Sequence, residues 1–236
     1  MEDQMFLDCF GCDIDYSLGK NFADFADQFS KDSRYRTELY KLRRKFMSHA
    51  DGLIHADLHT SNIMASRDKM KVIDMEFAFM GPFGYDLGYL VGNLISQYCA
   101  ACFKRFPSEQ NRKQFKAYLL ATIKSLIETY MKTFTLCWEK SVKERYRGQQ
   151  GLLQSILQEV MEDVPGYASM VNWFRSVSEI PYPDFDIIED KDAKRNATVL
   201  SLMIDWGIMF GRYKYQSADD LIETIIGIEE EFRKSL

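Results

Sequence analysis

Residues 53–86 read LIHADLHTSNIMASRDKMKVIDMEFAFMGPFGYD, and this stretch decides the fold. Its first half begins with the apolar pair Leu53 and Ile54 and continues to Asp57 and, five residues later, Asn62. Its second half places Asp74 directly after the apolar run at residues 70–73. The polar residues 67–69 between the halves favour a turn, so the stretch predicts a short β-hairpin with one carboxylate site at each end.

The order and spacing of these side chains suit phosphoryl transfer from a nucleotide. In that chemistry a carboxylate faces the acceptor hydroxyl, and an amide one short loop later turns back to a magnesium ion. We therefore expect Asp57 to orient the acceptor and take its proton late in transfer, and Asn62 to bind Mg²⁺. A carboxylate at a strand tip can hold metal that bridges two phosphates, which makes Asp74 a candidate ligand. Glu76 is a candidate second ligand or the holder of a bound water.

Each of these residues also has an interpretation without chemistry. Asp57 could cap its own loop, and Asn62 alone would be an ordinary turn residue. Asp74 and Glu76 alternate on a strand-like segment, so they could lie on an exposed strand edge. The combined spacing favours a catalytic role for Asp57 and a metal site at Asn62 and Asp74.

Two motifs resemble known phosphotransferases. Residues 55–62, HADLHTSN, are similar to the HGDLHxxN loop of the aminoglycoside phosphotransferase and choline kinase group, which has a protein-kinase-like fold. Residues 73–95, IDMEFAFMGPFGYDLGYLVGNLI, more closely resemble the 5-methylthioribose kinase family, which carries D-x-E where protein kinases have D-F-G. The chain departs from these patterns at Ala56, where the group has glycine, and at Asn62, where the methylthioribose kinases often have serine.

This resemblance implies a mainly α fold, namely the helical C-terminal lobe of a protein-kinase-like enzyme with a short β-hairpin that carries the catalytic and metal-binding loops. It also implies transfer of the ATP γ-phosphoryl group, with Mg²⁺, to the primary hydroxyl of 5-methylthioribose in methionine salvage. Two alternatives stay open: a kinase for another small hydroxyl substrate, such as an aminoglycoside or amino alcohol, and a non-catalytic kinase-like binding domain.

The resemblance also assigns roles around the loop. The family has a paired arginine near the sugar, and Arg175 is the residue that matches it here, although a solvated or packing arginine is an equal interpretation. Asp86 is implied to brace the catalytic loop, and the start of a helix suits a carboxylate that accepts amide hydrogens. His55 is expected to brace the turn, and His59 to be a second hydrogen-bonding strut.

Outside the hairpin the sequence pattern is helical, because apolar residues recur at helical spacing. Residues 111–146 are predicted to hold one or two helices, and residues 151–161 one helix bounded by Pro165. A break is expected at residues 181–183. The other predicted helices cover residues 21–29, 33–49, 87–98, 197–210 and 217–232, the last with Ser217 and Asp220 as a capping pair.

Length and composition bound the class of protein. The chain has 236 residues, 46% of them hydrophobic, which suits one domain spanning residues 1–236. Its net charge of -5 argues against a nucleic-acid partner, because neutralising phosphates needs a basic surface. No apolar run approaches the ~18 residues of a membrane span, and the N-terminus lacks the pattern of a signal peptide. We therefore expect a soluble cytoplasmic protein with no membrane partner.

The five cysteines include two C-x-x-C pairs, Cys9 with Cys12 and Cys99 with Cys102. A zinc site of four thiolates is formally possible, but the pairs lie far apart, and the second falls in an apolar helical pattern. Buried or free thiols are therefore the favoured interpretation. An odd number of cysteines in a cytosolic chain also disfavours a disulfide framework.

The residues before His55 read as helical, whereas kinases of this fold take a glycine-rich cover and a phosphate-binding lysine from an N-terminal sheet lobe. We therefore expect this chain to be the C-terminal lobe alone, as a fragment or a naturally short product. Such a lobe is expected to hold ATP weakly and to transfer no phosphate unaided. Its surface toward the missing lobe is expected to drive homodimer formation or association with that lobe.

Overall fold

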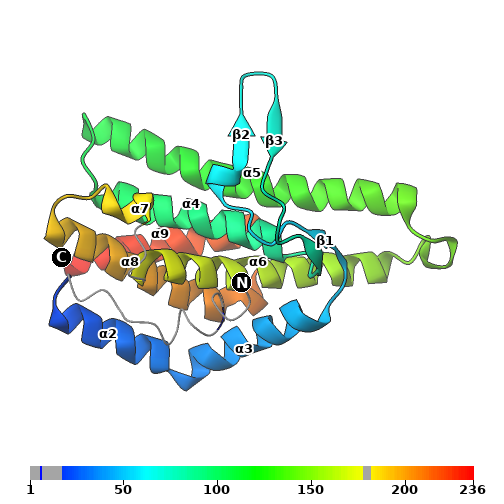
Figure 1. Cartoon of the computed structure of the whole chain (residues 1–236), viewed down its shortest axis with the longest axis horizontal. Helices are drawn as coiled ribbons and strands as arrows, with labels where there is room; N and C mark the ends of the chain where they lie inside the picture. The colour runs from blue at the N-terminus through cyan, green and yellow to red at the C-terminus, as the bar shows by residue number, and fades with distance from the viewer. Residues whose placement is uncertain (1–5, 7–17, 178–181) are drawn as a thin grey trace.

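The computed structural model describes residue 6, residues 18–177 and residues 182–236. Helices dominate this part of the chain (Figure 1), which confirms the predicted mainly α fold with a small β component. The α-helices are α2 (Lys20–Lys31), α3 (Ser33–Ser48), α4 (Tyr85–Phe103), α5 (Glu109–Ser141), α6 (Gln150–Val177), α7 (Pro183–Asp186), α8 (Lys191–Gly211) and α9 (Ala218–Ser235). Short 3₁₀ turns are η3 (Thr60–Asn62), η4 (Glu144–Tyr146) and η5 (Arg212–Lys214).

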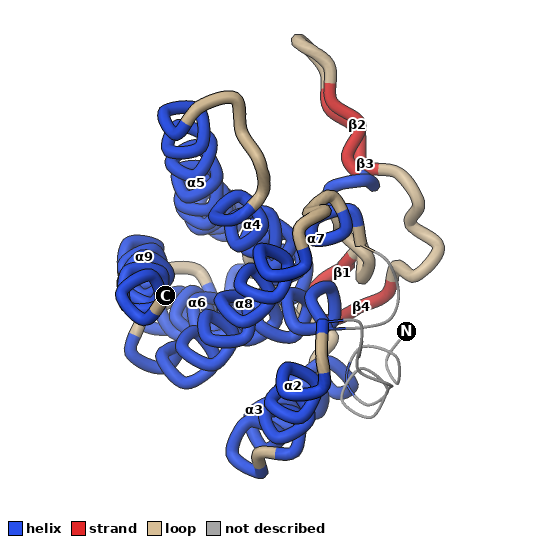
Figure 2. Tube along the Cα trace, turned by 90° about the vertical axis from the view of Figure 1, so that its left-hand side faces the viewer, coloured by secondary structure: helices blue, strands red, loops and turns tan. Residues whose placement is uncertain are grey.

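The centre of the bundle is formed by α4 and α6, and α8 packs against both. On one side α5 lies against α4 and α9 against α8, while α3 packs against α6 on another side (Figures 1 and 2). One buried apolar cluster fills the space among α4, α5, α8 and α9. A second, rich in aromatic rings such as Tyr35 and Trp173, joins α3, α4 and α6. These two clusters fix the position of α4, on which the loops of residues 53–86 rest.

The small β component consists of two antiparallel pairs of short strands. The predicted hairpin is present: β2 (Ile63–Ala65) pairs with β3 (Met70–Val72), and it projects from the bundle (Figure 1). A second pair, which the sequence did not reveal, joins β1 (Gly52–Ile54) to β4 (Phe79–Gly81). The β1–β4 pair joins the chain before the hairpin to the chain after it. The loop before β2 and the loop after β3 are therefore held side by side.

Helix α6 runs through Pro165, so the prediction that this proline bounds the helix is wrong. Proline removes one helical hydrogen bond because it has no backbone N–H. The helix continues because this part of it is buried against α4 at very close range. A Cβ placed on Gly88 would lie 2.7 Å from the Cβ of Tyr167, and one on Gly92 would lie 2.7 Å from the carbonyl oxygen of Ala168. Burial of the contact thus outweighs one missing hydrogen bond.

Further sequence predictions can be compared with the helices of the structure. The segment at residues 111–146 holds the single long helix α5 followed by η4. The capping pair of Ser217 and Asp220 is confirmed at the start of α9. Among the described residues no helix has the length and apolar character needed to cross a bilayer.

Two of the cysteines that form C-x-x-C pairs can be placed. Cys99 and Cys102 are buried in α4, and burial raises the pKa of the Cys102 thiol to about 12. Such thiols stay protonated and unreactive at neutral pH. Cys9 and Cys12 lie outside the described residues, as does Pro181 in the predicted break at residues 181–183.

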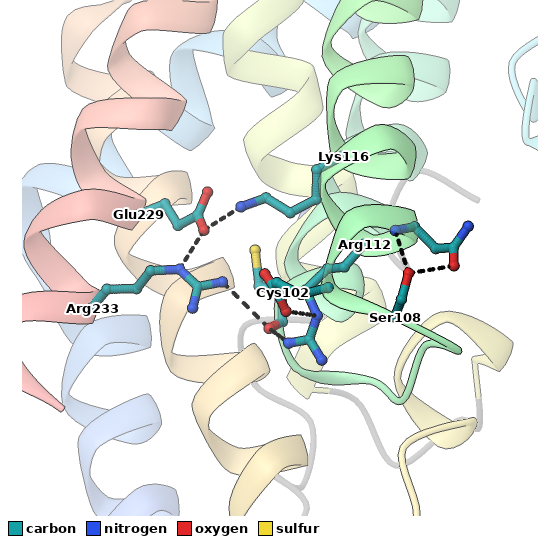
Figure 3. A network of polar contacts seen from close by, with 8 residues as sticks. Cys102, Ser108, Arg112, Lys116, Glu229 and Arg233 are labelled. Carbon is teal, nitrogen blue, oxygen red and sulfur yellow. Dashed lines mark hydrogen bonds and ion pairs between the residues drawn. The ribbon is translucent and has the colours of Figure 1, made fainter.

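A polar network ties the outer helices to α4 at one end of the bundle (Figure 3). Glu229 of α9 accepts hydrogen bonds from Lys116 of α5 and from Arg233, whose Nε lies 2.6 Å from Glu229 Oε1. The hydroxyl of Tyr98 in α4 donates to the other carboxylate oxygen. Burial alone would raise the pKa of Glu229, but these donors outweigh it and lower the pKa to about 2. The ionised carboxylate therefore joins three helices.

Candidate active site

The loop between β1 and η3 carries Asp57 at its centre. The Asp57 carboxylate is partly exposed, and its Oδ2 lies 3.5 Å from Nε2 of His59. Asn62 is buried, and its Nδ2 donates a hydrogen bond to the backbone carbonyl of Asp57 at 3.0 Å. This bond uses the amide nitrogen of Asn62, and among the described residues its Oδ1 has no hydrogen-bond donor, so this oxygen is available as a ligand.

Asp86 holds the start of this loop from α4. Its Oδ2 accepts the backbone N–H of His55 at 2.6 Å, and its Oδ1 accepts the N–H of Ala56 at 2.9 Å. Burial raises the pKa of Asp86, and the two amide donors act in the opposite direction. Both carboxylate oxygens are therefore occupied by the loop backbone, and the geometry provides no proton-transfer role.

The ring of His55 joins the catalytic loop to the segment after β3. Its Nε2 lies 2.8 Å from the carbonyl oxygen of Ile73, and its Nδ1 lies 3.3 Å from the backbone nitrogen of Asp57. Since the Asp57 N–H donates to Nδ1, the proton of the ring belongs on Nε2, which donates to Ile73. One imidazole therefore holds the backbone beside Asp57 and the residue immediately before Asp74.

Two residues of the site have left-handed backbone conformations. Ala56 has φ of 69° and Asp74 has φ of 66°. This conformation costs a side chain with a Cβ about 1–2 kcal/mol relative to the right-handed region. It explains on physical grounds why related loops carry glycine where this chain has Ala56. Non-glycine residues in such conformations often mark functional sites.

The structure places Asp74 and Glu76 after β3, in exposed loop residues, so the interpretation of an exposed strand edge is wrong. The backbone N–H of Ile73 donates to the carbonyl of Asn62 at 3.0 Å, so the residue immediately before Asp74 is held against the backbone of Asn62. Among the described residues no three His, Cys, Asp or Glu side chains are gathered as a ready metal site.

Arg175 lies near the end of α6 and is engaged by its neighbours. Its Nε lies 2.9 Å from Oδ2 of Asp184, and its guanidinium sits over the ring of Tyr182, 4.5 Å from the centroid. The ion pair is largely buried. The positive charge of Arg175 is thus balanced within the protein, and the guanidinium presents its remaining N–H donors as a fixed group.

Two residues of α4 beside the loop escaped the sequence interpretation. Asp57 is close enough for its negative charge to add to burial in raising the pKa of Tyr89, and the amide oxygen of Asn93 accepts the backbone N–H of Thr60 at 3.4 Å. Both fall within the predicted helix of residues 87–98, in which no residue was selected for the site. The signal that could have revealed them is their spacing of three and seven residues from Asp86, which puts all three side chains on one helix face.

Comparisons with known proteins agree with the motif at residues 55–62. Residues 15–126 match a family described as "Phosphotransferase enzyme family". The chain is 31% identical over 232 residues to the methylthioribose kinase of Geobacillus thermodenitrificans (strain NG80-2). The aligned region covers 97% of this chain and 55% of the relative. It is 30% identical over 220 residues to the methylthioribose kinase of Geobacillus sp. (strain WCH70), covering 93% and 52%.

A plant relative gives a similar result. The chain is 31% identical over 203 residues to "Methylthioribose kinase 2" of Oryza sativa subsp. japonica. The aligned region covers 81% of this chain and 47% of the relative. The chain therefore spans about half the length of the curated relatives it matches.

Proposed function

We propose that this chain, a half-length homologue of the methylthioribose kinases, is the acceptor-side lobe of an ATP-dependent small-molecule kinase. The observation that supports this most strongly is the His55 ring, which holds the loop of Asp57 against the segment of Asp74. A kinase needs these two carboxylates at a fixed separation, one for the acceptor and one for the metal.

In this proposal Asp57 accepts a hydrogen bond from the acceptor hydroxyl, orients it toward the γ-phosphorus and takes its proton late in transfer. Its partly exposed carboxylate can reach a bound alcohol, while its backbone is fixed by Asn62 and His55. His59 lies beside the same carboxylate and restricts its orientation. The protein supplies positioning, which is the main part of catalysis in phosphoryl transfer.

The donor set fits magnesium. Asn62 Oδ1 and the Asp74 carboxylate are hard oxygen ligands on adjacent segments, and Glu76 follows as a further ligand or the holder of a metal-bound water. Mg²⁺ bound there with ATP would neutralise phosphate charge. We assign Asp74 the larger contribution to Mg²⁺ binding, because its backbone is held by the hydrogen bond between residues 62 and 73. Glu76 lies further along the exposed loop.

We propose 5-methylthioribose, phosphorylated on its primary hydroxyl in methionine salvage, as the acceptor, because the relatives are named for it. Arg175 and Tyr182 offer a planar donor stacked on an aromatic ring, a combination that suits a neutral sugar with an apolar substituent. An aminoglycoside or amino alcohol is the runner-up acceptor.

The nucleotide lobe is proposed to dock on the side of the hairpin and the β1–β4 pair. Large apolar side chains are exposed there, which is unusual unless another surface covers them. They include Leu53, Met64, Met70, Met75 and Met80. A second copy of this chain is the alternative occupant. We place the protein in the cytoplasm, where ATP is available.

The experiment that tests the proposal is ATP-dependent phosphorylation of methylthioribose by this chain, alone and with the nucleotide lobe of a homologous kinase added. We expect transfer when the lobe is present and little without it. Replacing Asp57 by Asn should lower turnover by roughly 10²–10⁴-fold, the usual contribution of a general base, and leave thermal melting unchanged. Turnover retained by Asp57→Asn would remove the base assignment. Acceptor binding without transfer under all conditions would favour the non-catalytic binding domain.

Magnesium titration separates the two metal-site carboxylates. We expect Asp74→Ala to raise the Mg²⁺ concentration for half-maximal activity, or to abolish activity, more severely than Glu76→Ala. The reason is that Asp74 follows a residue pinned to both His55 and Asn62. Equal effects of the two substitutions would show that the pair acts as one shared ligand set.

A further inference from the structure

A cavity of about 440 Å³ lies between two loops at one end of the bundle. One loop follows the end of α4 at Phe103, and the other joins α7 to α8 (Figure 1). At a rise of about 1.5 Å per residue, Phe103 lies roughly 25 Å along α4 from Asp86, which braces the catalytic loop. The cavity is therefore separate from the proposed active site, and its volume is in the range of ordinary small-molecule sites.

Four large apolar side chains line the cavity. Phe103 and Phe106 come from the end of α4 and the loop after it, and Ile187 and Ile188 from the loop before α8. Ile188 is buried, whereas Ile187 is 63% exposed. An apolar group that entered the cavity would remove part of this surface from water, which is favourable. The cavity can therefore take an apolar side chain.

Charged side chains of both signs line the same cavity. Lys104 and Arg105 supply two cations, and Glu189 and Asp190 supply two carboxylates. Asp190 caps α8, because its Oδ1 accepts the backbone N–H of Ala193 at 2.8 Å. Within the described part of the chain, neither cation forms an ion pair, and neither does Glu189. The opposite charges thus line one cavity without pairing across it.

Lys104 is the most constrained of these charges. Its Nζ lies 4.6 Å from the centroid of the Phe115 ring and 5.1 Å from that of Phe106. Aromatic faces attract a cation, but they carry no net charge that could neutralise it. Burial lowers the pKa of Lys104, and the charge of Asp184, which is bonded to Arg175, acts in the opposite direction. A partly buried ammonium of this kind favours an anionic group beside it.

Other partly buried lysines have such a group. Lys45 pairs with Glu159 and with Asp163, and Lys116 pairs with Glu229. Lys104 differs from them in lining a cavity where a carboxylate could come from outside the protein.

We propose that this cavity binds a small zwitterion with an apolar side chain, namely an apolar α-amino acid. The carboxylate of the ligand binds Lys104 and Arg105, its ammonium binds Glu189, and its side chain packs on the phenylalanine and isoleucine side chains. A simple carboxylate would leave Glu189 without a partner, and a simple amine would leave Lys104 without one. A zwitterion satisfies charges of both signs.

Isothermal titration of the 236-residue chain with L-leucine, L-methionine and L-phenylalanine, each added separately, tests the site. We expect at least one of them to bind. If none of the three bound at concentrations up to about 20 mM, the proposal would be overturned. The measurement requires no phosphoryl transfer, so its outcome does not depend on the proposed kinase function.

Analogues with a single charge test the class of ligand. The tightest of the three amino acids is compared with its deaminated and its decarboxylated form, which for leucine are isocaproate and isoamylamine. Each analogue should bind about 10-fold more weakly than the amino acid, because each loses one charge-assisted contact. Equal binding by either analogue would overturn the assignment of a zwitterion.

Substitutions locate the bound ligand. Lys104→Met and Glu189→Gln should each weaken binding about 10-fold, for the same reason. Lys132→Met and Glu139→Gln are the matched controls, because both residues are exposed on α5 and neither lines the cavity. Glu189 is exposed, so its substitution should leave Tm unchanged and keeps the test decisive even if Lys104→Met does not fold. Parental affinity in Glu189→Gln, or in folded Lys104→Met, would overturn the site.

Discussion

Asp86 shows how one carboxylate can define the shape of a loop. It satisfies two consecutive backbone N–H groups that would otherwise be buried without partners. Asp86→Ala should lower the free energy of unfolding, since each unpaired amide costs about 1–3 kcal/mol. Urea unfolding of the two proteins at neutral pH measures the difference.

The control for this prediction is Asp186→Ala. Asp186 is an exposed carboxylate that pairs with Lys194 at 2.7 Å on the surface. Exposed ion pairs contribute about 0–1 kcal/mol, so this substitution should change stability far less. If Asp86→Ala unfolded at the same urea concentration as the parent and lost only activity, the bracing role would be incorrect.

At the residue scale the sequence predicted positions better than contacts. Asp57, Asn62 and Asp74 could be selected because chemistry requires their types at that spacing, and the structure brings their segments together. Their catalytic and metal roles stay predictions. Asn93 could not be selected, because an asparagine within a predicted core helix resembles a packing residue until the structure shows that its amide holds the backbone of Thr60.

At the scale of elements, the contact between α4 and α6 depends on residues without side chains. Gly88→Ala should destabilise the protein by about 1–3 kcal/mol, because the new Cβ would lie 2.7 Å from the Cβ of Tyr167 and 2.9 Å from the carbonyl oxygen of Val164. Thermal or urea unfolding measures the change. Gly227→Ala is the control in the exposed middle of α9, where no atom of the described residues lies within 4 Å of the added Cβ.

Gly227→Ala should stabilise the protein by up to about 1 kcal/mol, since alanine has the higher helix propensity. A substitution at Gly88 that behaved like the one at Gly227 would show that α4 and α6 can separate without cost. The opposite signs expected for the two changes separate packing from propensity.

The same contact explains an error of prediction. Helical spacing identified the helices that stand around the core, but Pro165 was taken as a boundary because local sequence rules treat proline as a helix breaker. Its tolerance depends on burial against α4, a partner some 75 residues away in sequence. The β1–β4 pair was missed for a related reason: three-residue strands carry little periodicity, and their partners are distant along the chain.

For the whole molecule, the network around Glu229 predicts the response to acid. Its folded pKa of about 2 lies below the ordinary value of 4.5, so the unfolded chain binds a proton at a higher pH than the folded one. The stability that Glu229 contributes is therefore complete above about pH 4.5 and is lost as pH falls toward 2. It should amount to on the order of 2 kcal/mol after allowance for solvent screening.

Unfolding of the parent and of Glu229→Gln over this pH range measures that contribution. The variant should be less stable at pH 7, and the gap should close as the pH approaches 2. A gap that stayed constant with pH would mean that the charge of Glu229 adds nothing beyond its hydrogen bonds. Asp186→Asn is the charge-matched control, because it removes one negative charge from an exposed ion pair with Lys194.

The His55 ring has a consequence for how such a lobe would respond to a ligand. Because one imidazole is bonded to the backbone on both sides of the hairpin, the separation between Asp57 and Asp74 is set during folding. A nucleotide arriving with its cation would not have to order these two groups, and the entropic penalty of binding falls accordingly. Any closing motion against a second lobe would carry both carboxylates as a rigid unit, with their spacing constant along the path.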